Sequence, residues 1–276
     1  MINISIDKCT GCGLCAEDCL QNDIAVVNKR ASPLNILCNN CGHCIAICPQ
    51  NAVVLENFDM KEVKEYNSKT FTIKPDNLLN AIKFRRSIRH FKKKKVEIEK
   101  IKKIIDAGRY TPTASNSQPL SFIVIQNKMK ELNKITIDLL YQYVNEYQTY
   151  MNDPVLNQNI KYINQWRIMY DEYKKGRDLL FYNAPIMIII LHDKRISPYT
   201  HIDGGLAATN MELMANSLKL GVCHSGIFTF VTEDISIRNF LYLPDNKYVV
   251  ASLLIGYTDI KYLRTVPRKK SEIQWL

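Results

Sequence analysis

The sequence predicts a mixed α and β protein in which a small cysteine-rich unit precedes a larger unit with a central sheet. Three observations lead to this fold class. Eight of the nine cysteines lie within residues 9–48. Short apolar stretches of strand type occur at 120–126, 186–191 and 248–255. Between them lie longer stretches with apolar residues at helical spacing, and such mixed elements are typical of a sheet covered by helices.

The cysteines form two runs with one spacing, C-x2-C-x2-C-x3-C, and Pro49 follows the second run. This is the spacing of bacterial ferredoxins with two [4Fe–4S] clusters, in which the fourth cysteine of each run binds the other cluster. We therefore expect one cluster to be held by Cys9, Cys12, Cys15 and Cys48. We expect the second to be held by Cys38, Cys41, Cys44 and Cys19. His43 lies inside the second run and is expected to flank or tune that cluster.

Zinc and disulfides are the competing interpretations of these cysteines. Zinc sites usually use C-x2-C pairs with a longer spacer, not triplets. Disulfides are typical of secreted proteins, and no signal peptide precedes Cys9. Leu20 stands where the first run would usually have proline, which removes no ligand. The thiolates and the missing targeting segment predict a cytoplasmic protein, and the longest apolar run, 184–191, is too short to span a bilayer.

We expect three segments along the chain. Residues 1–58 form a ferredoxin-like unit with an internal duplication, so small that bound clusters would supply much of its folding energy. Residues 59–75 are polar and form a linker, and residues 76–276 form the second domain. The first helix of this domain is expected to begin at Pro75 or Asp76. Further helices are expected over 98–108, 128–150, 156–175, 203–219 and 233–241.

The charge is unevenly distributed. Residues 1–58 hold three basic and five acidic side chains, whereas the rest of the chain holds 34 basic and 22 acidic ones. Basic charge serves nucleic acids, anionic cofactors or acidic partner proteins, or simply reflects a lysine-rich composition. No nucleic-acid motif accompanies it, so we expect no nucleic-acid partner.

Three separated patches of the second domain suggest binding of a phosphorylated, flat ligand. Arg85-Arg86-Ser87-Ile88-Arg89 offers guanidinium groups and a hydroxyl that suit a phosphate monoester. The loop Pro112–Pro119 presents the amides of Asn116 and Gln118, which suit the edge of a heterocycle. The loop Leu220–Gly226 lets backbone amides approach a flat ring. Each patch alone also fits an ordinary solvated loop.

Together the patches resemble the nitroreductase family of FMN-dependent oxidoreductases over residues 76–276. The resemblance implies an α+β fold with a central, mainly antiparallel sheet and flanking helices, and a homodimer with FMN at the subunit interface. It implies phosphate binding by Arg85, Arg86, Ser87 and Arg89, together with Arg268 and Lys270 of a basic C-terminal segment. It places Asn116, Gln118, Ser225 and Gly226 at the flavin. Leu120, His224 and Ser225 depart from common family residues on the substrate side.

The combination resembles ferredoxin–nitroreductase fusion proteins. It implies an iron–sulfur flavoprotein that passes electrons between clusters and FMN to reduce a nitroaromatic, quinone or enone, with a ferredoxin, flavodoxin or NAD(P)H as donor. Two alternatives remain: an NAD(P)H-fed reductase that uses the clusters as electron store or exit, and a non-enzymatic redox sensor or carrier. No catalytic side chain is assigned, and the candidate proton sources are solvent, His224 and a tyrosine of the proposed lid. Cys223 is interpreted as a buried thiol, and the tyrosine-rich segment 141–182 as a lid, a subunit contact or a core face.

Overall fold

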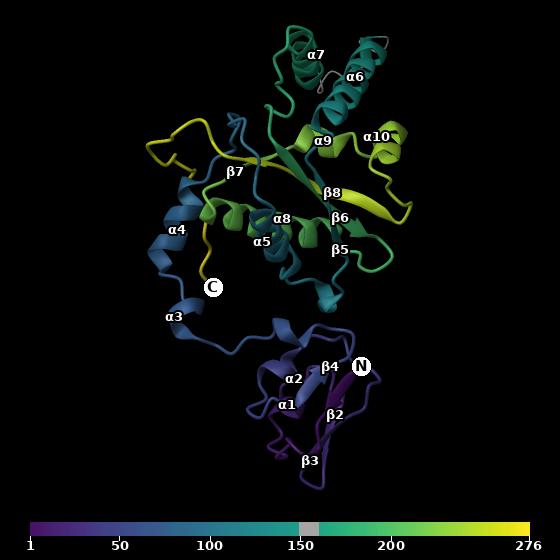
Figure 1. Cartoon of the computed structure of the whole chain (residues 1–276), viewed down its shortest axis with the longest axis vertical. Coiled ribbons are helices and arrows are strands. Elements are labelled where there is room, and N and C mark those ends of the chain that lie inside the picture. Colours follow the sequence, from purple (N-terminus) through teal and green to yellow (C-terminus); the bar gives the residue numbers. More distant parts are fainter. Residues whose placement is uncertain (149–159) are drawn as a thin grey trace. The chain divides into compact units, whose positions relative to one another are not determined.

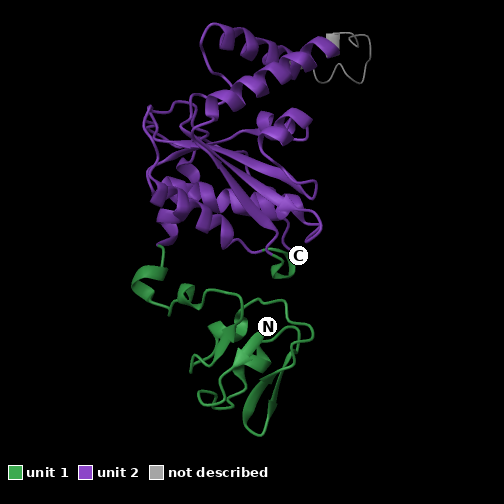
Figure 2. Ribbon diagram, turned by 45° about the vertical axis from the view of Figure 1, so that its right-hand side comes forward, with its two compact units in different colours: residues 1–73, 113–117 green, residues 74–112, 118–276 purple. Residues whose placement is uncertain are grey.

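The computed structural model describes the backbone of residues 1–148 and 160–276. It describes the side chains of residues 1–146 and 162–276. The chain divides into two compact units (Figure 2). The smaller contains Met1–Ile73 together with Thr113–Ser117, and the larger contains Lys74–Pro112 and Gln118–Leu276.

The cysteine-rich part of the smaller unit contains two antiparallel strand pairs and two one-turn α-helices. Strand β1 (Ile2–Ile4) pairs with β4 (Val53–Leu55), and β2 (Ile24–Val27) pairs with β3 (Arg30–Pro33). The helices are α1 (Leu14–Glu17) and α2 (His43–Ala46).

Each one-turn helix begins directly after a glycine in the left-handed region, Gly13 at φ 83° and Gly42 at φ 78°. Residues with a side chain rarely adopt this conformation, so glycine allows each cysteine loop to turn sharply into its helix. The third cysteine of each run then lies inside the helix and is buried, at Cys15 and Cys44. The two halves of the unit thus repeat one local structure.

The polar segment after the smaller unit's strands contains the 3-10 turn η1 (Met60–Glu62) and the short helix α3 (Ser68–Phe71). Side chains of Asp59 and Asn67 cap them by accepting backbone N–H bonds. Neither element buries a side chain.

The larger unit is built on a four-stranded antiparallel sheet of order β5-β6-β8-β7 (Figure 1). Its strands are β5 (Leu120–Ile125), β6 (Ile186–Asp193), β8 (Lys247–Gly256) and β7 (Gly221–His224). This confirms the antiparallel sheet that the family resemblance implied. All eight residues of β6 are buried, because β6 has a strand on each side and helices on both faces.

Alternate residues of β6 face two different hydrophobic clusters, as the two-residue period of a strand requires. Ile186, Ile188 and Ile190 pack with α5 (Ile98–Arg109) and α8 (Thr200–Ser217). Met187, Ile189 and Leu191 point to the opposite face of the sheet, where they pack against side chains of four other helices. These are α6 (Met129–Gln148), α7 (Ile160–Lys174), α9 (Gly226–Phe230) and α10 (Ile235–Phe240).

Helix α4 (Pro75–Phe84) begins at Pro75 and leaves all of its side chains exposed. Two elements differ from expectation. Residues 221–224, expected as a loop, form the edge strand β7, and α8 begins at Thr200, three residues before the expected start. Across the described residues, no helix is both long and apolar enough to cross a membrane.

Tyrosines of the segment 141–182 join α6 and α7. The rings of Tyr141 and Tyr170 stack with their centroids 3.8 Å apart. Tyr143 donates a long hydrogen bond, 3.5 Å, to the carboxylate of Asp234. Tyr147 and Tyr150 lie outside the described side chains. The described tyrosines thus tie the two helices together and to the segment before α10.

Candidate functional sites

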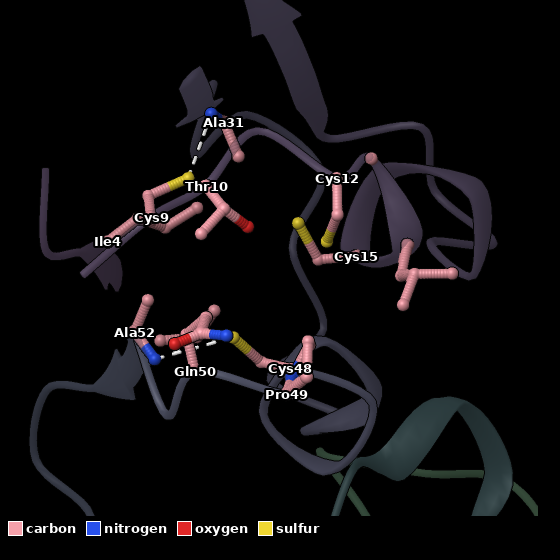
Figure 3. A pocket seen from close by; sticks show the side chains of 13 residues that line it. Ile4, Cys9, Thr10, Cys12, Cys15, Ala31, Cys48, Pro49, Gln50 and Ala52 are labelled. Carbon is pink, nitrogen blue, oxygen red and sulfur yellow. Dashed lines mark hydrogen bonds between the residues drawn. The ribbon is translucent and has the colours of Figure 1, made fainter. Parts of the chain in front are cut away.

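Four cysteines of the smaller unit surround one hollow. Cys9, Cys12 and Cys15 come from the first loop and α1, and Cys48 comes from the end of the second run. Figure 3 shows their sulfur atoms around an open centre. Apolar side chains of Ile4, Ala31, Pro49, Ala52 and Val53 complete the lining. The four thiols that the spacing assigned to one set therefore line one space.

The other four cysteines line a second hollow, and these are Cys19, Cys38, Cys41 and Cys44. The two hollows are similar in size, about 350 and 380 Å³ including space open to solvent. One kind of bound group would therefore suit both. His43 also lines the second hollow, and its Nδ1 lies 3.2 Å from the Asp18 carboxylate.

In each cysteine run, backbone amides donate hydrogen bonds to the sulfur atoms of the first and the fourth cysteine. Four such bonds of 3.3–3.4 Å are formed, by Ala31 to Cys9, Asp23 to Cys19, Asn40 to Cys38 and Ala52 to Cys48. Amide donors stabilise negative charge on sulfur. The amide of Ala31, followed by that of Gly11, lowers the pKa of the Cys9 thiol. Burial raises the pKa of Cys15, and raises that of Cys44 to about 11.

The carboxylate of Asp23 holds the loop that leads into the second cysteine run. Its Oδ1 accepts the N–H groups of Ile36 at 2.9 Å and Leu37 at 3.0 Å, and its side chain is buried. These bonds, that of Leu37 first, lower the pKa of Asp23. The carboxylate therefore fixes the backbone directly before Cys38.

In the larger unit, the first and third sequence patches meet on one buried carboxylate. Glu212 projects from α8, and its side chain is 6% exposed. Its Oε1 accepts a hydrogen bond from Arg85 Nη1 at 3.2 Å, and its Oε2 lies 3.3 Å from His224 Nε2. Arg85 and His224 remain partly open to solvent, at 32% and 42% of their side chains. Glu212 is absent from the three sequence patches, although it is the one carboxylate of the apolar stretch Met211–Ala215.

The backbone also joins these two patches. Ile88 donates its N–H to Val222 of β7 at 2.9 Å, and Ser87 and Val222 form a parallel bridge. The approach is close at Gly221, where an added Cβ would lie 2.6 Å from Ile88 Cγ1. The arginine-rich segment therefore runs along the edge of β7 that does not pair with β8.

The arginines of the first patch point to different partners. Arg86 Nη1 donates to the backbone oxygens of Lys83 and Arg85, while Arg86 Nη2 is buried with no hydrogen-bond partner in the described residues. Ser87 is half-buried between Arg86 and the buried Ile88. A buried donor without a partner is costly, so Arg86 Nη2 is suited to an anion that binds there.

Arg89 lies beside Tyr182 and Cys223 instead. Its guanidinium is 5.9 Å from the centroid of the Tyr182 ring. Cys223 is buried at 4% exposure, and burial raises its pKa despite the nearby Arg89. This environment is that of a protonated apolar thiol, as expected, and not of an activated nucleophile.

The loop Pro112–Pro119 has an unusual backbone. Ser115, Asn116 and Gln118 have φ values of 50°, 53° and 47°, in the left-handed region that side chains disfavour. Clusters of such residues are found at functional sites more often than elsewhere. Asn116, grouped with the smaller unit, donates its side-chain amide to the carbonyl oxygens of Asn39 at 3.2 Å and Asn40 at 2.9 Å. Its amide is thus engaged within that unit.

Ser225 and Gly226 lie where β7 passes into α9. Ser225 is buried, and its N–H donates to Ser252 on β8 at 2.8 Å. Gly226 opens α9, and an added Cβ there would meet no atom within 4 Å. Space for a ligand therefore lies beside the backbone at this point. Arg268 and Lys270 lie in the exposed C-terminal segment, and within the described residues neither has an acidic partner.

Comparisons with known proteins concern mainly the larger unit. A family model described as "Nitroreductase family" matches residues 82–257. The cysteine-rich segment lies outside that match. The chain is 25% identical over 199 residues to a chloronitrobenzene nitroreductase from Comamonas testosteroni, covering 65% of this chain and 86% of the relative. It is 27% identical to a putative NADH dehydrogenase/NAD(P)H nitroreductase from Methanothermobacter thermautotrophicus, covering 66% of this chain and 77% of the relative.

Solved structures support the same fold. A nitroreductase with bound FMN from Bacteroides fragilis superposes with a TM-score of 0.54 at 22% identity, covering 71% of this chain and 98% of that one. A nitroreductase with bound FMN from Desulfitobacterium hafniense has a TM-score of 0.52 at 23% identity, with the same coverage. At these identities the likeness concerns the fold.

Proposed function

The chain belongs to the nitroreductase family of oxidoreductases, and from that membership we propose that it is an iron–sulfur flavoenzyme. In this proposal two [4Fe–4S] clusters in the smaller unit exchange single electrons with FMN in the larger unit, and a small organic acceptor is reduced. The observation that carries the proposal is the presence, in one chain with a nitroreductase fold, of two hollows each lined by four thiols.

The donor set of the thiol hollows supports the assignment of [4Fe–4S] clusters. Each hollow offers four sulfur ligands. The remaining lining of the first hollow is mostly apolar, whereas the second also contains Gln21, Asn39, Asn40 and His43. Backbone amides donate to four of the eight sulfurs. Among the described residues, no three His, Cys, Asp or Glu side chains converge on a single metal ion. Four cysteine sulfurs around one hollow match the ligand number of a [4Fe–4S] cluster.

The larger unit offers groups that fit the phosphate and ring of FMN. Arg86 Nη2 is a buried donor without a partner, and Arg85 uses only Nη1 toward Glu212. These arginines and Ser87 would hold the phosphate. Open space beside Gly226 would admit a flat ring close to the backbone. FMN, when bound, accepts electrons one at a time and passes them on as a pair.

We propose a nitroaromatic as the acceptor, with quinones and enones as further candidates. Curated relatives are described as reductases of chloronitrobenzene, 4-nitrobenzoate and nitrobenzene. A nitro group that takes up two electrons and two protons becomes a nitroso group and releases water. His224 is a partly exposed imidazole in the third patch, and it is the candidate source of one of these protons.

A second candidate function is a reductase fed directly by NAD(P)H, with the clusters storing or exporting electrons. It is favoured by relatives described as NADH dehydrogenase/NAD(P)H nitroreductases. In the first candidate, reduced ferredoxin or flavodoxin is the donor. A sensor or carrier without turnover is the third.

We further propose a homodimer in which the flavin lies at the subunit interface. Helix α4 exposes Leu78, Leu79 and Ile82, which lie on one apolar stripe, at 40–48% each. The C-terminal segment exposes Ile273 and Trp275. Apolar side chains grouped in this way are typical of surfaces that a partner covers.

One experiment tests the function directly. The full chain, purified without oxygen, is analysed for iron, sulfide and FMN, and nitrobenzene reduction is then followed with reduced ferredoxin, NADH or NADPH. We expect eight iron atoms and one FMN per chain and fastest turnover with ferredoxin. Turnover with NAD(P)H alone would favour the second candidate. If the protein purified without oxygen contains neither FMN nor iron, the proposal is rejected, whether or not the preparation reduces nitrobenzene.

A further inference from the structure

Glu212 is a buried carboxylate to which the proposed reaction assigns no role. A carboxylate with a 6% exposed side chain loses most of its hydration, and it is tolerated only when its oxygens are paired. Both oxygens of Glu212 are used, one by Arg85 and the other by His224. These two partners come from the first and third sequence patches, and neither is fully buried.

The contact to Arg85 restricts one guanidinium nitrogen and leaves the others available. Nη1 donates to Glu212, and among the described residues Arg85 makes no further side-chain hydrogen bond. A guanidinium presents five N–H groups in a rigid plane, so fixing one edge also fixes the direction of the rest. Glu212 therefore sets the direction in which Arg85 offers its remaining donors.

The contact to His224 restricts the position of a proton. An ionised carboxylate only accepts hydrogen bonds, so the ring nitrogen that faces it, Nε2, must carry the hydrogen. Nδ1 of the same ring forms no hydrogen bond with any described residue. In the neutral ring Nδ1 then carries the lone pair and can accept a hydrogen bond. The other ionisable groups near this site are Arg85, Arg89 and Cys223, and the Cys223 thiol is buried and protonated.

We propose that Glu212 is a positioning residue for this active site. It holds Arg85 for the cofactor phosphate and holds the His224 ring with Nε2 protonated and Nδ1 free to exchange a proton with the acceptor. This inference rests on the proposed function for its phosphate half. Its histidine half is a property of the protein itself.

Two variants separate the two halves. In Glu212→Gln the amide oxygen still accepts from Arg85, which can only donate, so the amide NH2 must face His224. The His224 ring then has to accept at Nε2 and carry its hydrogen on Nδ1. Glu212→Leu removes both contacts but keeps the apolar volume.

The first measurement is ¹⁵N NMR of the full chain with labelled histidine, recorded from pH 6 to pH 9, with the His224 signal assigned from its loss in His224→Gln. In the wild type we expect the neutral ring to carry its hydrogen on Nε2. In Glu212→Gln we expect the neutral ring to carry its hydrogen on Nδ1. A neutral wild-type ring with its hydrogen on Nδ1, or one tautomer shared by both proteins, would overturn the proposal.

The second measurement is the affinity for FMN and for riboflavin, which lacks the phosphate. We expect Glu212→Leu to weaken FMN binding about tenfold or more, as for loss of one well-placed charged hydrogen bond. Riboflavin binding should change less than about threefold, and Glu212→Gln should bind FMN like the wild type. Equal weakening of both ligands, or unchanged FMN affinity in Glu212→Leu, would refute the phosphate half.

The failure of the proposed function looks different. A wild-type chain that binds neither FMN nor riboflavin would reject the flavin assignment, and the NMR measurement would still decide the role of Glu212 toward His224. Thermal unfolding of both variants, compared with the wild type, distinguishes a lost fold from a lost contact.

Discussion

Arg85 Nη1 and Glu212 Oε1 lie 3.2 Å apart, and this pairing anchors the arginine-rich segment to the buried face of α8. Through the same carboxylate the segment is joined to His224. Side chains from separated parts of the sequence therefore meet at one buried carboxylate.

Replacing the arginines should separate flavin binding from cluster binding. Arg85→Ala and Arg268→Ala each remove a guanidinium proposed to hold the phosphate, which should cost about 1.5–3 kcal/mol, or about one to two decades of FMN affinity. Cluster absorbance should persist, because both arginines belong to the larger unit.

Fluorescence titration with FMN measures these affinities. Arg109→Ala is a matched control, since Arg109 pairs with Asp106 on the exposed side of α5. FMN affinity that is unchanged in both variants would refute the phosphate assignment.

Gly221→Ala should weaken the junction between β7 and the arginine-rich segment. The new methyl group would lie within 3 Å of the buried Ile88 side chain. We expect a loss of about 1–3 kcal/mol of stability, typical of overpacking, together with weaker FMN binding. Urea unfolding and FMN titration measure the two effects. Gly205→Ala is the control, because its Cβ meets no atom within 4 Å, and equal behaviour of the two variants would contradict this role of Gly221.

The sequence predicted the elements whose signals are long. The strands at 120–126, 186–191 and 248–255 and the helix closed near Gly108 are confirmed within a few residues. Apolar side chains repeat there over several turns or strand residues, so local pattern and final burial agree.

Two kinds of feature were not predicted from the sequence: a very short strand, and contacts between residues that are distant in the sequence. Strand β7 has four residues, and its existence depends on pairing with β8 and on the bridge from Ser87, neither of which leaves a local pattern. Glu212 was missed because its partners are distant in sequence. The sequence pattern that points to Glu212 is an acidic residue on the helix face that also contains the buried Ala208, Met211 and Ala215. The cysteines line the two hollows in the two groups of four that their spacing predicted, and their binding of clusters stays a prediction.

Asp23→Ala should selectively affect the second thiol hollow. The Asp23 carboxylate accepts the amides of Ile36 and Leu37, which precede Cys38. Leaving these amides without an acceptor should cost about 1–3 kcal/mol and loosen that loop. We expect iron to fall from about eight toward about four atoms per chain.

Iron analysis and electron paramagnetic resonance of the reduced protein measure this loss. Asp7→Ala, at an exposed position of the smaller unit, is the control. A full iron content in Asp23→Ala, with normal cluster lifetimes, would argue against the loop's role.

Acid should weaken the larger unit through Asp193. Hydrogen bonds from Arg195 first, and from Asn246, lower the pKa of this carboxyl below its ordinary value of about 3.9. A lowered folded-state pKa contributes stability above about pH 4 that is lost as the pH falls toward the folded-state value. Asp193→Asn should therefore be less stable than the wild type at pH 7 and should lose less stability on acidification.

Urea unfolding followed by tryptophan fluorescence reports on this unit, since Trp166 and Trp275 both belong to it. Asp245→Asn is the control at an exposed position. If the wild type and Asp193→Asn depend on pH in parallel between pH 7 and pH 3, the assignment of this stability to Asp193 is wrong.

The central claim, that the clusters and FMN exchange electrons, is tested most directly by an anaerobic titration of the full chain. Reduced ferredoxin is added stepwise while the flavin and cluster absorbance bands are followed separately. We expect the flavin band to bleach in the wild type, and to bleach much more slowly in a Cys9→Ala, Cys38→Ala variant that keeps its FMN. A flavin band that stays oxidised while the clusters are fully reduced would contradict it.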